Sequence, residues 1–275
     1  GVVEYADGTV ARGVSINTDP LNGGALLASI ANEDGGPVGG TVIAEWKAGA
    51  ALTHDGGAGT DVLLEDRLVL KTGSREAGGI SSETAGLYDL TETGAQIFLN
   101  AVDYMLHPEP FNVTWVSFHP ADDEAGTGAA DAGFEEAPDK PYTDLLRSAG
   151  YNVTRYVTNG DPDVELLSES DLVIIARGVS SGHYAGDSAT AWNSVAAPVL
   201  NMGGYTLRSS RMGFTTGTAM VDTTGDITLN VLDPSHAIFA GIPITDGVMD
   251  NTYAGVVEYA DGTLARGISI NNDPL

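Results

Sequence analysis

The sequence predicts an α/β protein in which a mostly parallel β-sheet carries helices on both faces. Three observations lead to this fold class. Strand patterns alternate with helix patterns between residues 112 and 202, one of these strands is apolar throughout, and 42% of the 275 residues are hydrophobic. A chain of this length and composition can bury a core of its own. We therefore expect one large α/β domain or two small ones.

The two ends of the chain carry copies of one segment. Residues 1–21, GVVEYADGTVARGVSINTDPL, recur at residues 255–275 as GVVEYADGTLARGISINNDPL, a shift of 254 positions, and three of the 21 positions differ. Two differences exchange apolar residues and the third exchanges polar ones, which a shared position in a fold tolerates. Each copy predicts a β-hairpin around an Asp-Gly turn.

An isolated hairpin needs neighbours to cover it, and the repeat allows three interpretations. The chain is one period of a tandem array plus the start of the next, or a separate subunit that docks on its neighbours by strand addition, or a closed pseudo-symmetric monomer. The first two predict head-to-tail assembly with copies of itself, because a contact that does not close generates a filament. The residues expected to form this assembly hairpin are Val3, Tyr5, Asp7, Gly8, Arg12, Val257, Tyr259, Asp261, Gly262 and Arg266.

The amino-terminal third supplies strands and one long helix. Residues 41–46 and 67–72 have the composition of strands. Residues 90–106 predict an amphipathic helix with one broad apolar face, and Pro108 and Pro110 end it.

The middle of the chain alternates strands and helices. The expected strands are 112–118, 151–158, 171–176 and 197–202, and the expected helices are 142–149, 164–168 and one that Asp187 or Ser188 caps and that runs to Val195. A long acidic loop, residues 119–139, precedes the first helix. Such a series forms a parallel sheet with helices on both faces. Residues 226–231 then predict a strand, and residues 233–243 a turn with a short helix.

Charge limits the set of partners. Thirty-eight acidic and 12 basic residues give a formal charge of −26. Such a surface repels nucleic acid and anionic membranes, and no apolar run is long enough for membrane insertion. The charge suits a protein bathed in salt or divalent cations. The chain begins at Gly1 without a methionine, as a processed product or a segment of a longer protein would, and we expect it outside the cell, at the cell surface.

Three segments resemble a known superfamily: S-D-L-V-I-I-A-R-G-V-S-S-G (170–182), A-A-P-V-L-N-M-G-G-Y (196–205) and H-A-I-F-A-G-I-P (236–243). With them, residues 111–254 resemble the flavodoxin-like, class I glutamine amidotransferase-like domains, especially the degenerate copies in tandem-repeat bacterial surface proteins. Residues 1–110 resemble the closing portion of the same domain, which here precedes the first strand. The resemblance implies a flavodoxin-like, doubly wound sheet with added β-hairpins, circularly permuted within a tandem repeat whose next unit begins with residues 255–275.

The resemblance also implies a copy without catalysis. Working members of that superfamily carry a cysteine nucleophile in a G-x-C-x-G turn, and Gly203 stands at that position in a chain that has no cysteine. We therefore predict a protein that is not an enzyme.

One motif supports an alternative, a serine hydrolase or carbohydrate-processing enzyme of the same fold. Residues 178–182 fit the G-x-S-x-G pattern around Ser180, and Asp233 and His236 follow in a permissible order. In a true nucleophile elbow the helix begins directly after the serine, whereas here five residues intervene, starting with the last glycine of the motif. The other interpretation is a glycine-rich loop at the carboxyl edge of the sheet, where doubly wound sheets bind ligands.

The acidic loop offers carboxylates to calcium, the single cofactor that the sequence suggests. Asp122, Asp123 and Asp131 are the candidate ligands, so a calcium-dependent adhesion or carbohydrate-binding module is a further alternative. A solvated charged loop is the simpler interpretation, because no calcium-loop spacing is present. Asn112 and Asn152 each begin an N-V-T sequon and are candidate glycosylation sites. The hypothesis that accounts for most of these features is a structural repeat unit of an extracellular filament or surface layer.

Overall fold

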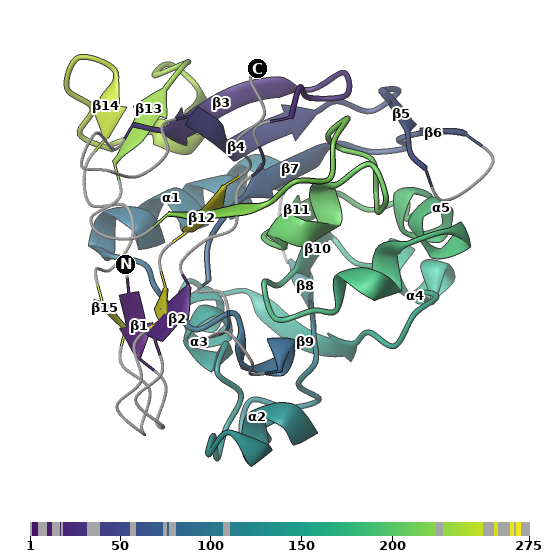
Figure 1. Ribbon diagram of the computed structural model, residues 1–275, viewed down its shortest axis with the longest axis vertical. Coiled ribbons are helices and arrows are strands. Elements are labelled where there is room, and N and C mark those ends of the chain that lie inside the picture. The colour runs from purple at the N-terminus through teal and green to yellow at the C-terminus, as the bar shows by residue number, and fades with distance from the viewer. Residues whose placement is uncertain are drawn as a thin grey trace.

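A nine-stranded mixed sheet forms the centre of the computed structural model (Figure 1). The structure describes residues 17, 19–31, 39–55, 59–73, 76, 81–106, 111–220 and 228–249, and the backbone of strands at 2–4, 10–12, 221–223, 256–257, 265–266 and 268–270. The strands of the sheet are β3 (Ala25–Ile30), β4 (Gly39–Trp46), β7 (Arg67–Leu70), β8 (Asn112–Ser117), β9 (Asn152–Val157), β10 (Leu172–Ile175), β11 (Val199–Asn201), β13 (Leu229–Val231) and β14 (Val248–Met249).

The strand order is β14-β13-β3-β4-β7-β11-β10-β8-β9. The run from β7 to β9 pairs in parallel throughout, whereas β4, β3, β13 and β14 continue the sheet with antiparallel pairs. The α/β class with a large parallel portion is therefore confirmed. β7 lies beside β11 although it precedes β8 in the sequence, so the amino-terminal third completes the parallel run.

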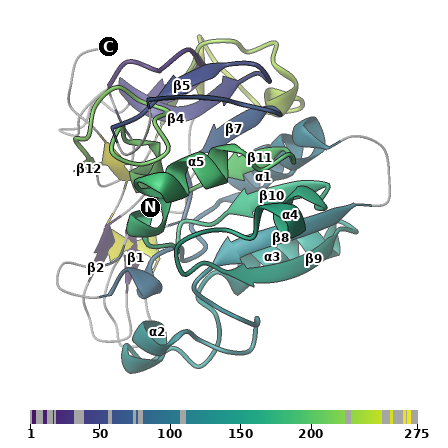
Figure 2. The same ribbon diagram turned by 90° about the vertical axis from the view of Figure 1, so that its right-hand side faces the viewer.

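Helices cover both faces of the sheet (Figure 2). They are α1 (Glu92–Met105), α3 (Lys140–Ser148), α4 (Val164–Ser168) and α5 (Asp187–Asn193), with a short α2 (Thr127–Asp131) outside the two layers. In β10, Leu172 and Ile174 belong to the core that α1 and α3 cover, whereas Val173 and Ile175 belong to the core that α4 and α5 cover. A strand buried on both faces explains why its sequence is apolar throughout.

The long helix α1 confirms the amphipathic pattern read from the sequence. Thr91 caps its start by accepting a hydrogen bond from the Gly94 amide at 3.2 Å, and the helix ends at Met105. Its buried side chains include Ile97, Phe98 and Val102, which pack on the sheet. None of the helices in the described ranges is long and apolar enough to cross a bilayer.

Two regions differ from the sequence-based expectation. The acidic segment 119–139 is not simply a loop, because α2 forms within it. β3 and the hairpin β5 (Ala51–Thr53) and β6 (Thr60–Val62) were not expected. Residues 27–30 of β3 are all buried, so this strand lacks the apolar and polar alternation that a half-exposed strand shows.

The terminal repeats form a second, four-stranded sheet (Figure 1). It contains β1 (Val2–Glu4), β2 (Val10–Arg12), β15 (Val256–Val257) and β16 (Ala265–Arg266), in the order β15-β1-β2-β16. β1 and β2 are antiparallel, so the hairpin predicted for the first copy is confirmed. β15 and β16 lie at opposite edges of this sheet, so the hairpin predicted for the second copy is wrong. A further strand of the second copy, β17 (Ile268–Ile270), pairs with β12 (Val221–Thr223).

Candidate functional site

The two copies of the repeated segment pair with each other, each residue opposite its own equivalent. β1 runs parallel to β15 with Val2 opposite Val256, and β2 runs parallel to β16 with Arg12 opposite Arg266. In both cases the paired residues are 254 positions apart, which is the spacing of the sequence repeat. Both outer edges of the first hairpin are thus occupied by the second copy within this chain.

Four of the predicted assembly residues lie in these strands: Val3, Arg12, Val257 and Arg266. The other six lie outside the described residues, namely Tyr5, Asp7, Gly8, Tyr259, Asp261 and Gly262.

Ser180 lies at the carboxyl edge of the parallel strands, between β10 and the 3-10 turn Ser181–Tyr184. Its backbone has φ −76° and ψ 116°, an ordinary extended conformation and not the strained turn of a nucleophile elbow. The next α-helix begins only at Asp187. The glycine-rich loop expected at this edge is therefore present.

Gly203 follows β11 at the same edge. Its amide donates to Asn201 Oδ1 at 2.9 Å, and a Cβ built at this position would lie 3.2 Å from Thr206 Cγ2. Asn201 Nδ2 also donates to Thr206 Oγ1 at 2.7 Å. A small internal hydrogen-bond network of Asn201 and Thr206 therefore surrounds Gly203.

The other two residues of the hydrolase alternative lie elsewhere. His236 packs its ring against Tyr104, with centroids 4.5 Å apart, and its Nε2 lies 3.7 Å from Glu45 Oε2. Glu45 pairs with Leu68 near the amino end of β7, whereas Ser180 lies beyond the carboxyl end of β10. Asp233 Oδ1 accepts hydrogen bonds from the amide and hydroxyl of Ser235. The structure does not bring Ser180, Asp233 and His236 together.

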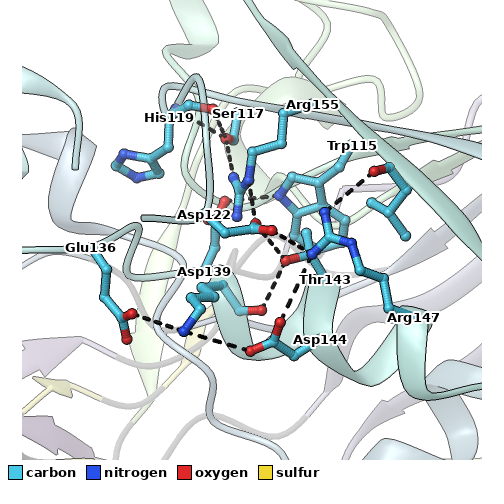
Figure 3. Close-up of polar contacts among 12 residues, drawn as sticks. Trp115, Ser117, His119, Asp122, Glu136, Asp139, Thr143, Asp144, Arg147 and Arg155 are labelled. Carbon is cyan, nitrogen blue, oxygen red and sulfur yellow. Dashed lines mark hydrogen bonds and ion pairs between the residues drawn. The ribbon is translucent and has the colours of Figure 1, made fainter. Parts of the chain in front are cut away.

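Asp122, the first candidate calcium ligand, instead belongs to a buried ionic cluster at the end of β8 (Figure 3). Its Oδ1 accepts from Arg155 Nε at 2.6 Å and from Thr143 Oγ1 at 2.7 Å, and its Oδ2 pairs with Arg147. Burial alone would raise the pKa of Asp122, but the hydrogen bonds from Thr143 and Arg155 and the two guanidinium charges hold it below its usual value.

Arg155 connects this cluster to the sheet. Its Nη2 lies 2.9 Å from Asp139 Oδ1 and its Nη1 donates to Ser117 Oγ at 3.1 Å. Asp139 Oδ2 in turn accepts from Trp115 Nε1 at 2.9 Å. The side chains of Arg155 and Asp139 are 3% and 1% exposed, so this is a buried pair.

The two remaining candidate ligands, Asp123 and Asp131, are exposed. In the described ranges no three His, Asp or Glu side chains are placed to hold a metal ion together. Calcium binding stays a prediction.

The sequon residues Asn112 and Asn152 lie opposite each other on β8 and β9. Both are exposed, and Asn152 Nδ2 donates to Asn112 Oδ1 at 3.4 Å. In the first sequon, Thr114 Oγ1 shares a hydrogen bond with Ser170 Oγ at 2.7 Å. Glycosylation stays a prediction at both positions.

His119 is buried beside the ionic cluster, where its Nδ1 accepts a hydrogen bond from the Gly126 amide at 2.9 Å. Burial is the largest influence and lowers its pKa. Arg155 acts in the same direction, and the carboxylates Asp139 and Glu83 oppose it. Because Nδ1 must be unprotonated to accept this hydrogen bond, the folded state holds a neutral imidazole.

We therefore expect His119 to make the fold less stable as the pH falls below about 6.5, where the unfolded chain takes up the proton first. The neutral form is favoured in the folded state, so its contribution is complete above the unfolded pKa and is lost toward the lower folded pKa. Urea unfolding between pH 7 and pH 5 measures this slope. His119→Asn keeps an acceptor without a titrating group and should flatten it; equal slopes in the two proteins would contradict the assignment.

Comparison with protein-family models, curated proteins and solved structures gives no match. The superfamily resemblance therefore stays a prediction from the three sequence segments.

The structure also shows functional candidates that sequence reasoning missed. Arg177, Tyr205 and Glu76 line a cavity of about 170 Å³ beside Ser180, and Arg208 lies next to it. The sequence held one signal: Arg177 directly follows the expected strand 171–176 in a chain with only 12 basic residues.

Proposed function

We propose that this chain is a structural repeat unit of an extracellular filament or surface layer and that consecutive units associate through the repeated hairpin. The observation that carries the proposal is the pairing of β1 with β15 and of β2 with β16 at the exact offset of the repeat. If residues 255–275 open the next unit, this pairing is a contact between one unit and the next.

A second contact supports the same arrangement. β17, which also belongs to the second copy, pairs with β12 over three residues of this unit, with Asp222 opposite Ser269. The first copy is held separately, because Asn17 O accepts from the Thr41 amide at 2.6 Å and Asn17 Nδ2 donates to Thr215 Oγ1 at 2.6 Å. The opening segment of a following unit would therefore be bound at two places.

The core is proposed to be a rigid, non-catalytic, flavodoxin-like and amidotransferase-like domain, circularly permuted within the repeat. Its support is that β7, from the amino-terminal third, lies beside β11, and that Gly203 sits where a nucleophile would be needed. A doubly covered sheet has little freedom to deform, which suits a load-bearing unit.

Electron microscopy of native material tests the assembly. We expect strings with a repeat of roughly 40 to 60 Å, the size of one such domain. Val257→Pro removes a backbone donor from β15 and restricts its φ, so it should weaken the strings, whereas Val257→Ala keeps the donor and serves as the matched control. Monodisperse single domains in native material, or equal behaviour of the two variants, would contradict the proposal.

A further inference from the structure

The cavity at the carboxyl edge brings scarce positive charge together in a strongly acidic protein. Its lining includes Glu76, Ser82, Arg177, Ser180, Ser181 and Tyr205. These residues follow β7, β10 and β11, neighbouring strands of the parallel run. Clefts outside the carboxyl ends of such strands are the usual place for ligands in open α/β sheets.

Arg177 is the central group of the cavity. It is 4% exposed, and its Nη2 forms an ion pair with Glu76 Oε2 at 3.3 Å. Its Nε is buried without a hydrogen-bond partner among the described residues. A buried guanidinium is normally paired on more than one edge, so this one retains donor capacity.

Arg208 adds a second guanidinium near the ring of Tyr205. The Cζ atoms of Arg177 and Arg208 lie 5.6 Å and 4.9 Å from the centroid of the Tyr205 ring. Arg208 is held in place because its Nε donates to Tyr205 O at 2.9 Å and its Nη2 donates to Ser181 Oγ at 3.0 Å. The arrangement fixes two cations around one aromatic ring.

Other basic side chains lie near Arg177 and Arg208. Burial, followed by the charge of Arg177, lowers the pKa of Lys71 at the end of β7 well below its usual value. Burial, followed by Arg211, lowers that of Arg208. The positive charges of Arg177 and Arg211 thus lower the pKa values of Lys71 and Arg208, in a chain whose net charge is −26.

Close backbone packing holds Arg177 in position. A Cβ added at Gly73 would lie 2.9 Å from Arg177 Cβ, one at Gly86 would lie 2.9 Å from the Gly178 amide nitrogen, and one at Gly178 would lie 2.9 Å from Ala85 O. Gly73 and Gly86 also have positive φ, +79° and +89°. The absence of side chains at these glycines lets three chain segments meet directly beside the arginine.

We propose that this cavity is a binding site for the oxyanion group of a small ligand, a carboxylate or a phosphate, which Arg177 contacts with its guanidinium group and which the hydroxyls of Ser82 and Ser180 flank. Guanidinium groups are the usual partners of both oxyanions. Because the acidic surface repels anions elsewhere on the protein, we expect anionic ligands to bind at this cavity in preference to the rest of the surface. The site does not depend on the hairpin contact.

The test titrates the complete 275-residue chain with inorganic phosphate and, separately, with glucuronate, at an ionic strength kept constant with sodium chloride. Melting temperature and calorimetry follow binding. We expect a saturable rise in melting temperature, because the ligand binds only the native state. Saturation by phosphate alone, by glucuronate alone or by both supports the site and assigns the oxyanion; saturation by neither overturns it.

Two variants that should change the binding affinity in opposite directions make the test specific. Arg177→Gln should weaken binding by about tenfold or more, as loss of charge-assisted hydrogen bonds does, while Glu76→Gln removes a competing carboxylate and should strengthen binding. Lys47→Gln, with the same charge change at the amino end of the strands, is the control.

If Arg177→Gln does not fold, Ser180→Asp provides an independent reading. It places a carboxylate at the cavity and should abolish binding while circular dichroism stays unchanged. Unaltered affinity in Ser180→Asp, or equal affinities in Arg177→Gln and Lys47→Gln, would overturn the proposal.

Discussion

Replacement of Asp139 by alanine is expected to destabilise the fold by about 3 to 5 kcal/mol, the range for breaking a buried ion pair on one side. Arg155, whose side chain is 3% exposed, loses one of its two carboxylate partners in this variant. The variant also removes the hydrogen-bond acceptor of the buried Trp115 indole. The penalty arises because neither group can reach water when its partner is lost. Chemical denaturation with a fluorescence readout measures the change in the free energy of unfolding.

Two further variants separate charge from packing. Asp139→Asn keeps an acceptor for Trp115 and should lie between alanine and the native chain. Arg147→Met removes a cation that also pairs with Asp122 but is 37% exposed, so we expect a change of about 1 kcal/mol or less. If Arg147→Met lowered the free energy of unfolding as much as Asp139→Ala does, the buried pair would not stabilise the fold more than the exposed one.

Arg67→Met is expected to cost about 3 kcal/mol or more, because it removes the donors for several buried carbonyl groups. Arg67 Nη2 donates to Val195 O at 2.7 Å and Nη1 donates to Ala197 O at 3.0 Å, so the guanidinium joins β7 to the chain that follows α5. The side chain is 1% exposed, and burial lowers its pKa to about 10 although Glu65 and Asp66 act to raise it. It therefore remains charged at neutral pH and donates to carbonyl groups of the segment that follows α5.

The matched control replaces a cation, Lys47, at the end of β4, the strand that pairs with β7. Lys47 follows β4, and its side chain is 56% exposed in pairs with Glu45 and Asp66. Lys47→Met should change the free energy of unfolding by about 1 kcal/mol or less. Comparable losses in the two variants, measured by thermal and urea unfolding, would contradict the role assigned to the carbonyl contacts of Arg67.

The sequence predicted those helices and strands whose buried residues form a periodic or a continuous apolar pattern. α1 shows the helical period, and β10 lies within the apolar run 171–176. β3 was missed because its buried residues do not alternate with exposed ones and because the polar Ser29, which is buried, interrupts its apolar run. Local patterns report the burial of each residue, and two-sided burial in a short strand gives no periodicity.

The ionic cluster illustrates a different limit. Asp122 and Asp139 were interpreted as part of an acidic loop, solvated or available to calcium, whereas each pairs with Arg155 on β9. Nothing in the local sequence connects an acidic residue to an arginine that lies on the next strand. The same holds for the cavity, where Arg177 and Arg208 meet only because β10 and β11 are adjacent.

The register that places four positions of the first copy opposite their own equivalents has a consequence for sequence divergence. A mutation at one of these positions places a changed residue opposite the original one. Two identical residues pair again only when the other copy acquires the same mutation. The paired positions should therefore diverge in sequence more slowly than the other positions of the repeated segment. The three exchanges already present, Val10 to Leu264, Val14 to Ile268 and Thr18 to Asn272, fall outside the four pairs that join β1 to β15 and β2 to β16.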